Sequence, residues 1–260
     1  MFDSNRMALN ISKTKFMVFS KHDSISLRLD NQTIHKVSNI KFLGINIDNT
    51  LKWETHFNGI SKKLASSLFA IRTVSLELND VRISLEVYHA LFESYLRYGV
   101  IFWGYMTVSR CNILFLLQKR AIRIICKADR IAHCKPLFKF LKVLTFYDVI
   151  AFETVTFLHN KQLEKRGDIH SYATRIRDDL NLPQSRSTVS KFSLYHYGKS
   201  LYNAIPLRIR LLDTRRFKRT LKVALIESVN YSFNELFTCT VPLQMRIDLI
   251  SQISQSRINK

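Results

Sequence analysis

The sequence predicts an α+β chain, in which a small antiparallel β unit precedes a mainly α-helical region. Strand signals are confined to the stretch from Lys15 to Ile47. After Thr50 the apolar residues instead recur every three or four positions, which is the period of an amphipathic helix. The 260 residues include only six glycines and four prolines, a composition that disfavours a loop-rich β-sandwich and favours long helices.

Three short apolar runs make up the predicted β unit: KFMVFS, ISLRLD and NIKFLGINID. The second run alternates strictly, with apolar side chains at Ile25, Leu27 and Leu29. Residues 30–33, DNQT, are predicted to form a tight turn, because Asp and Asn side chains supply local hydrogen bonds. Gly44 falls inside the third run, where it predicts a β-bulge or a close approach of another backbone.

Two amphipathic helices are predicted after the β unit. The apolar stripe of the first recurs at intervals of three and four residues: Trp53, Phe57, Ile60, Leu64, Leu68 and Ile71. Asp80, after Asn79, is the predicted N-cap of the second helix. The apolar face predicted for that helix is Ile83, Val87, Leu91 and Tyr95.

A third helix, predicted to begin near Ser109, carries a row of cations. Lys119, Arg123 and Lys127 follow one another at intervals of four residues, and no acidic residue interrupts the stretch between them. Ion pairing between neighbouring turns therefore does not explain the row. A solvated helix face and a phosphate-binding face both remain open.

The rest of the chain is predicted to be mostly helical, with one polar interruption. Thr145, with Asp148 three residues on, resembles a capping box at the start of a helix. Apolar density falls across residues 164–193, which are predicted to be a linker or a long loop. A last helix is predicted after Asp213. Its apolar side is surrounded by cations: Arg215, Arg216, Lys218, Arg219 and Lys222.

The charge balance favours a polyanionic partner. Forty Lys and Arg against twenty Asp and Glu give a net charge of +20. Nucleic acid is the simplest such partner, an anionic membrane surface is the second, and a basic protein without such a partner is the third. No run of 18 apolar residues and no signal-peptide core occurs, so we expect neither a membrane span nor secretion. An intracellular location, nuclear or cytoplasmic, is therefore expected.

The four cysteines show no CxxC spacing, so neither a disulfide framework nor a zinc ribbon is expected. Their usage fits a reducing compartment. Cys126, His133 and Cys134 offer three donors within nine residues, but no fourth ligand stands at a matching spacing. No metal site is expected.

Three stretches read together resemble the post-catalytic part of a non-LTR, LINE-like (jockey-type) retrotransposon reverse transcriptase. They are ALNISKTKFMVFS, NIKFLGINIDNTLKWETHFNGISKKL and YLRYGVIFWG with LQKRAIRIIC, and the later GKSLYNAIPLRIR region also resembles the end of such polyproteins. The resemblance implies a C-terminal fragment of an RNA-directed DNA polymerase. Residues 1–50 would be the end of the palm, 51–130 a helical thumb and 131–260 a mostly helical C-terminal region with a polar linker near 164–193.

The resemblance also implies roles for particular residues. Lys13 matches the motif D lysine near the triphosphate of the incoming nucleotide, with Lys15 close behind. KFLGINID resembles the motif E hairpin, or primer grip, where Gly44 would let the backbone approach the primer end. Thumb cations would hold the template–primer duplex by its phosphates: Lys62, Lys63, Lys119, Arg120, Arg123 and Lys127. Trp53 and Trp103 offer rings for base stacking, but their apolar surroundings favour core packing.

The catalytic motif of that family has no counterpart in this sequence. The intact family uses palm aspartates that hold two Mg²⁺ ions, the last pair within a [FY]-x-D-D turn. Asp178-Asp179 is the only adjacent aspartate pair here, and it lacks flanking strands. We therefore expect no cofactor in this chain and no polymerase activity from the chain alone.

Two functions remain open. The first is a fragment of a reverse transcriptase that retains the parts that hold template and primer. The second is a non-enzymatic basic RNA- or DNA-binding module, or a decayed transposon relic. An RNA template, an RNA–DNA hybrid or a DNA duplex is the expected partner in both, with no membrane, and the oligomeric state is left open.

Overall fold

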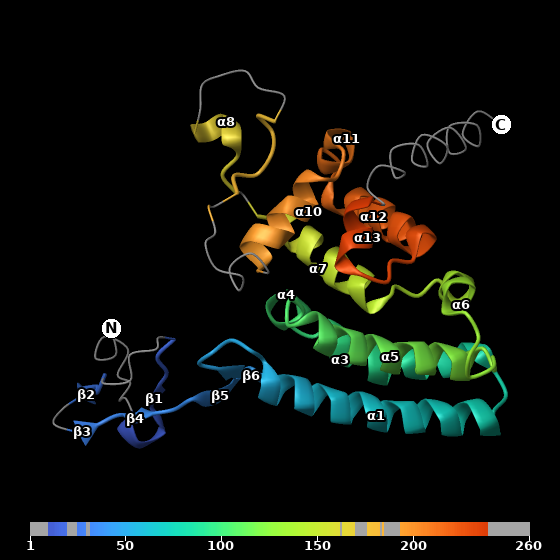
Figure 1. Ribbon diagram of the computed structural model, residues 1–260, viewed down its shortest axis with the longest axis horizontal. Coiled ribbons are helices and arrows are strands. Elements are labelled where there is room, and N and C mark those ends of the chain that lie inside the picture. Colours follow the sequence, from blue (N-terminus) through green and yellow to red (C-terminus); the bar gives the residue numbers. More distant parts are fainter. Residues whose placement is uncertain are drawn as a thin grey trace. The chain divides into compact units, whose positions relative to one another are not determined.

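The computed structural model describes residues 10–19, 25–29, 32–161, 163–169, 176–182, 184 and 193–238 (Figure 1). The chain is mixed, with 61% helix and a few small strands in short sheets, so the α+β expectation holds at this level. It divides into two compact units, Met1–Ser61 and Lys62–Lys260, which are described separately.

Within the described residues of the first unit, the strands form three two-stranded sheets, and the 3₁₀ turn η2 (Ile11–Lys13) precedes them. The sheets pair β1 (Lys15–Phe16) with β4 (His35–Lys36), β2 (Arg28–Leu29) with β3 (Gln32–Thr33), and β5 (Asn39–Phe42) with β6 (Ile45–Asp48). The expectation of a purely antiparallel unit is wrong, because β1 and β4 run parallel. The β2–β3 hairpin lies between them in the sequence, and β4 follows directly on β3.

The alternating run around β2 does not bury an apolar face. Ile25, Leu27 and Leu29 are 47%, 44% and 37% exposed, and only Leu29 lies in a strand. Strands of two residues give their side chains little to pack against. The turn expected at 30–33 is wrong in its second half, because Gln32 and Thr33 form β3 and pair with β2, while residues 30–31 lie outside the described residues.

Gly44 lies in the turn of a tight hairpin. Leu43 and Gly44 have φ angles of 46° and 82°, and Phe42 pairs with Ile45 on either side of them. Two consecutive residues with positive φ match the right-handed twist of a two-residue hairpin. The expectation of a bulge within one long strand is therefore wrong, and the hairpin that the resemblance implied is present.

Asp48 connects this hairpin to the first long helix. Its carboxylate accepts hydrogen bonds from the backbone N–H groups of Thr50, Lys52 and Trp53, and Trp53 has a positive φ of 60°. Burial raises the pKa of Asp48, but these hydrogen bonds and the one from the Thr50 hydroxyl outweigh burial and lower it. The bonds fix the turn from which α1 (Glu54–Glu77) begins.

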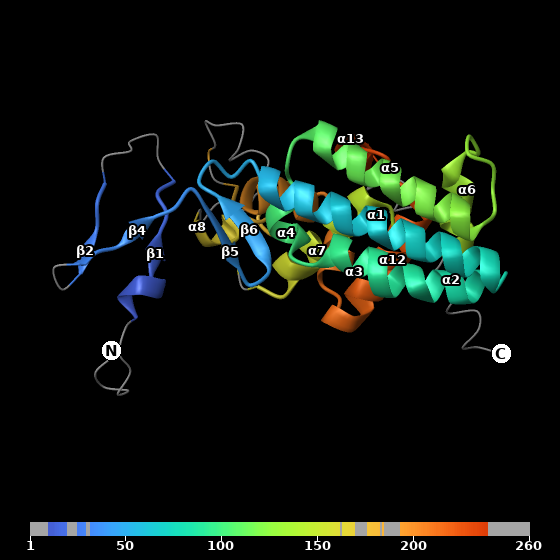
Figure 2. The ribbon, with the colours of Figure 1, turned by 90° about the horizontal axis from the view of Figure 1, so that it is seen from below.

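The predicted first helix is confirmed as α1, and Ile60, Leu64 and Ile71 are buried along it. Its residues from Lys62 on belong to the second unit. There α1 runs alongside α5 (Val108–Ile125), as Figures 1 and 2 show, and the Ser75 hydroxyl donates to the Ile124 carbonyl at 3.2 Å.

The second helix is capped as predicted but buries a different face. The Asp80 side chain accepts from the Arg82 N–H, and one helical run follows through α2 (Val81–Val87), the π-helical segment η3 (Tyr88–Glu93) and α3 (Ser94–Arg97). Ile83 and Leu91, expected inside, are 38% and 42% exposed. The residues that the run buries are Ser84, Tyr88, Phe92, Glu93 and Leu96. The buried face is offset from the expected one by a single residue, and the offset is present at Ser84, before the π segment begins.

Helix α7 (Phe146–His159) is the centre of the second unit (Figure 1). Ten of its residues are buried, because helices surround it on several sides. Its neighbours are α3, α4 (Val100–Trp103), α5, η4 (Leu194–Gly198), α10 (Lys199–Asn203), α12 (Thr214–Ser228) and α13 (Phe233–Thr238). The remaining described helices are α6 (Cys134–Leu141), α8 (Arg166–Ile169) and α11 (Leu207–Arg210).

Gln118 ties three parts of this unit together. Its side-chain amide donates to the Tyr88 hydroxyl at 2.8 Å and to the Leu144 carbonyl at 2.9 Å, and its oxygen accepts from the Phe146 N–H at 2.7 Å. Trp103 is also fully buried and stacks on Phe146, so the expected core role of this tryptophan is confirmed.

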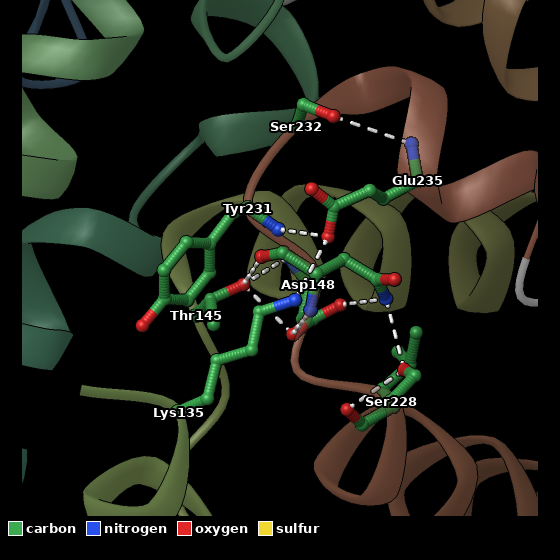
Figure 3. A network of polar contacts seen from close by, with 9 residues as sticks. Lys135, Thr145, Asp148, Ser228, Tyr231, Ser232 and Glu235 are labelled. Atoms are coloured by element: carbon green, nitrogen blue, oxygen red, sulfur yellow. Dashed lines mark hydrogen bonds and ion pairs between the residues drawn. The ribbon is translucent and has the colours of Figure 1, made fainter. Parts of the chain in front are cut away.

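A second polar network secures the N-terminus of α7 (Figure 3). Thr145 caps the helix as expected, since its hydroxyl accepts from the Asp148 N–H at 3.1 Å. The buried Asp148 carboxylate accepts from the Asn230 side chain at 2.6 Å and from its N–H at 3.2 Å. Burial raises the pKa of Asp148 to about 7 although these donors lower it. The network fixes the segment after α12 to the start of α7.

Candidate nucleic-acid interface

The first unit displays Lys13 and Lys15 on its surface. Lys13 is the last residue of η2, and the Asn10 side chain caps that turn by accepting from the Lys13 N–H at 3.2 Å. The Thr14 hydroxyl also donates to the Asn10 carbonyl, at 2.9 Å. Both lysines are exposed, so the turn presents two cations at the start of β1.

Gly44 is exposed at the tip of the β5–β6 hairpin. The neighbouring Phe42 and Leu43 are 60% and 74% exposed. The hairpin therefore ends in an apolar tip with no side chain at its second turn position, which another backbone could approach closely.

Four of the expected thumb cations are exposed on the second unit. Lys62 and Lys63 lie on α1, Arg120 lies on α5, and Lys127 follows the end of α5. The Lys63 ammonium lies 4.9 Å from the centre of the Tyr95 ring, which is a cation–π contact at a surface site. Each is accessible to a phosphate group.

The expected row of Lys119, Arg123 and Lys127 is not a continuous face of one helix. Helix α5 ends at Ile125, and Lys127 lies beyond its C-cap with a positive φ of 50°. The Lys119 ammonium lies 4.2 Å from the Tyr231 ring, and burial lowers its pKa. Arg123 donates to the Ala132 carbonyl at 2.9 Å. The geometric expectation of a row is wrong, because intrachain contacts draw two of its members inward.

A longer run of exposed cations lies on α12. The members of this α12 basic stripe are Arg215, Lys218, Arg219 and Lys222. Residues three, four and seven positions apart share one face of an α-helix, so the four side chains project together. Phe217, Leu221 and Leu225 are buried on the other side of the helix. None of the four cations forms an ion pair with an acidic residue in the described part of the chain.

The sequence contained the signal for this stripe, since five cations stand among the eight residues from Arg215 to Lys222 with no acidic residue between them. The sequence pattern predicted these cations only as the surroundings of an apolar helix face. Asp213 before them is occupied as the predicted N-cap, accepting from the Arg215 and Arg216 N–H groups at 3.0 and 3.1 Å. It also pairs with the Arg216 side chain at 3.4 Å.

The adjacent aspartates are engaged in ion pairs. Asp179 pairs with Arg210 at 2.9 Å, and Asp178 pairs with Lys165 at 3.7 Å. A Mg²⁺ site needs carboxylates that converge on one point, whereas these two each face a cation. Within the described residues, no three His, Cys, Asp or Glu side chains are placed to hold a metal ion. These residues therefore do not fit the two-metal site of the polymerase family.

No protein-family model, no curated protein and no solved structure matches this chain. Among the described residues, no helix combines the length and the apolar character that a membrane crossing requires.

Proposed function

We propose that this chain holds a nucleic-acid duplex by its phosphate backbone, as the template–primer-binding part of a non-LTR retrotransposon reverse transcriptase. In this proposal residues 1–50 belong to the palm, 51–130 form the thumb and 131–260 form the C-terminal region. The support is the order of the LNISKTK, FLGINID and QKRAIR motifs in the sequence, together with the hairpin at Gly44 and the helical region after it.

The α12 basic stripe is the observation that carries the proposed binding. From Arg215 to Lys222 the stripe is about 10 Å long, at 1.5 Å for each helical residue. Phosphates of one strand follow one another at about 3.4 Å along the duplex axis, so the stripe is as long as about three phosphate steps. They lack acidic partners among the described residues, so no intrachain ion pair has to break when phosphate binds. Phosphate contacts of this kind position a duplex without reading its sequence.

In this role the chain binds the template–primer duplex and carries out no catalytic step. Lys13 would neutralise charge near the triphosphate of an incoming nucleotide only where the palm aspartates are also present. The ion pairs of Asp178 and Asp179 favour this division of roles, since each carboxylate already has a cation beside it.

The test is a titration of a labelled RNA–DNA hybrid with the chain at increasing salt. We expect log K to fall linearly with log salt, because each phosphate contact releases condensed cations. The double variant Arg219→Gln/Lys222→Gln should reduce the slope by up to about 1.8, since each contact contributes about 0.9.

The matched control is Arg72→Gln/Lys142→Gln, which removes the same charge from exposed positions outside the α12 basic stripe. Its slope should stay within a few tenths of the wild-type slope. A flat salt dependence of the wild-type chain, or equal slopes for the two double variants, would contradict the proposed binding surface.

A further inference from the structure

A cavity of 260 Å³ lies where the end of α7 meets α10, α11 and the loop around Leu180. Five leucines and Tyr202 supply most of its apolar wall. Lys161, Lys165 and Arg210 stand in the lining against a single carboxylate, that of Asp178. The volume is just below the usual range for ligand sites, about 300–1,000 Å³, so the cavity suits one small ligand with an anionic group.

Hydrogen bonds hold two walls of this cavity in place. The Asn203 side chain accepts from the Leu180 N–H at 2.8 Å and donates to the Leu180 carbonyl at 3.0 Å. His159 must donate from Nε2 to the Leu212 carbonyl, at 3.1 Å, because a carbonyl only accepts. Its Nδ1 therefore accepts from the Tyr202 hydroxyl at 3.2 Å. A ligand would find these walls already formed.

Arg210 has an unused donor in the lining. Its side chain is only 9% exposed, and its terminal nitrogens donate to the Asp179 carboxylate at 2.9 Å and to the Asp178 carbonyl at 3.1 Å. Its Nε is buried and has no hydrogen-bond partner within the described residues. Buried polar atoms nearly always have a partner, so this N–H, which has none among the described residues, is a donor that a ligand in the cavity would satisfy.

We infer that this cavity binds one nucleotide, with the base against Tyr202 and the leucines and the phosphate near Lys161 and Arg210. A planar aromatic ring suits an apolar wall that includes an aromatic side chain, and the lining cations suit a phosphate. Lys161 is exposed at the cavity and has no ion-pair partner within the described residues, whereas Lys165 pairs with Asp178 at 3.7 Å. The choice of a nucleotide rests on the proposed function.

The experiment is calorimetric titration of the full chain with uridine 5′-monophosphate, uridine and inorganic phosphate. We expect saturable binding of the monophosphate and weaker binding of each part alone. Lys161→Gln and Arg210→Gln should each weaken the monophosphate about tenfold, the usual loss for one charge-assisted hydrogen bond. Lys142→Gln, the matched control, should bind like the wild-type chain.

The inference is overturned if the monophosphate does not saturate, if phosphate alone binds as tightly, or if Lys161→Gln binds like wild type. Arg210→Gln also loses the ion pair with Asp179 and can fail to fold for that reason. In that case the affinity of Lys161→Gln for the monophosphate decides whether the inference stands. The hybrid titration is a separate result. Hybrid binding without nucleotide binding rejects only this inference, and nucleotide binding without hybrid binding rejects the proposed function.

Discussion

Asp148 is a carboxyl group that the fold buries at the start of a helix and surrounds with donors. The Thr145 hydroxyl and the Asn230 side chain and N–H all contact it, at 2.7, 2.6 and 3.2 Å. Burial opposes the ionised form more strongly than these donors favour it, so the pKa rises from 3.8 to about 7. The folded protein therefore keeps a proton that the unfolded chain releases.

This proton makes the stability depend on pH in a definite direction. The protonated Asp148 makes its full contribution to the free energy of unfolding below about pH 4, and this contribution is lost as the pH rises to about 7. Asp148→Asn cannot titrate, so its free energy of unfolding should rise relative to wild type over that interval, by on the order of 4 kcal/mol. Urea unfolding of both proteins at several pH values measures the difference.

Asp80→Asn is the opposing control, because hydrogen bonds from Arg82 lower the pKa of this N-cap carboxyl group. These hydrogen bonds stabilise the ionised Asp80 carboxylate in the folded protein. The free energy of unfolding of Asp80→Asn should therefore fall relative to wild type as the pH rises through the Asp80 pKa. A relative stability of Asp148→Asn that stays constant between pH 4 and 7 would contradict the prediction for Asp148, because it would show that Asp148 is already ionised in the folded protein.

Single residues were predictable from the sequence where their partners are local. The caps at Asp80, Thr145 and Asp213 follow from side chains that bond N–H groups two or three residues away, and all three are confirmed. Gln118 and Asn230 were not predicted. Their partners lie up to 30 and 85 residues away, and no local pattern encodes such a distance.

At the scale of elements, two glycines let neighbouring segments approach α7 closely. A Cβ on Gly104 would lie 2.5 Å from the Val100 carbonyl and 2.9 Å from Ile150 of α7. A Cβ on Gly198, in η4, would lie 2.6 Å from the methyl group of Thr154 in α7. The Thr154 hydroxyl also lies 2.6 Å from that of Tyr105, so rotating this side chain would break a buried contact.

Gly104→Ala and Gly198→Ala should therefore each lower the free energy of unfolding, by about 1–3 kcal/mol, because the added methyl group overpacks the helix contact. Gly59→Ala is the matched control. Its Cβ would meet nothing nearer than 4.0 Å, and removing a glycine from the interior of α1 should stabilise by up to about 1 kcal/mol. Chemical denaturation of the three variants gives the comparison, and equal effects at all three positions would contradict it.

The positions of the helices were predicted better than the side of each helix that faces the core. The first helix, the third helix and the Asp213 helix all form where the periodicity places them. The second helix buries Tyr88 and Phe92 in place of Ile83 and Leu91, because two adjacent sets of positions share the spacing of four residues and packing decides which set faces the core. The cation row failed for a different reason, because α5 ends two residues before Lys127.

For the molecule as a whole, the charge of +20 is a cost to the folded state, since compaction brings like charges together. Salt screens this repulsion. We expect the melting temperature to rise as sodium chloride increases from low to physiological concentration, by about 2–4 °C for each kcal/mol gained. Circular dichroism on heating measures this rise.

The Arg219→Gln/Lys222→Gln variant carries two fewer positive charges and should show a smaller rise. A melting temperature that falls with added salt would mean that ion pairs such as Arg97 with Glu93 and Glu153 outweigh the repulsion between cations. The net charge of +20 follows from the composition alone. The placement of those charges on an exposed face of α12 required the fold, because composition does not say which cations lack acidic neighbours.

The π-helical segment η3 contains the equivalent of one inserted residue, which an ordinary helix would not contain. Deleting one residue there would close the segment into a regular α-helix, and the residues after it would keep their orientation, since the wide turn already absorbs the extra residue. Arg97 would then stay beside Glu153 of α7, and Leu96 would stay in the core. Inserting a further residue would instead turn everything downstream by about 100° and separate these contacts. The segment should therefore tolerate the loss of one residue far better than the gain of one.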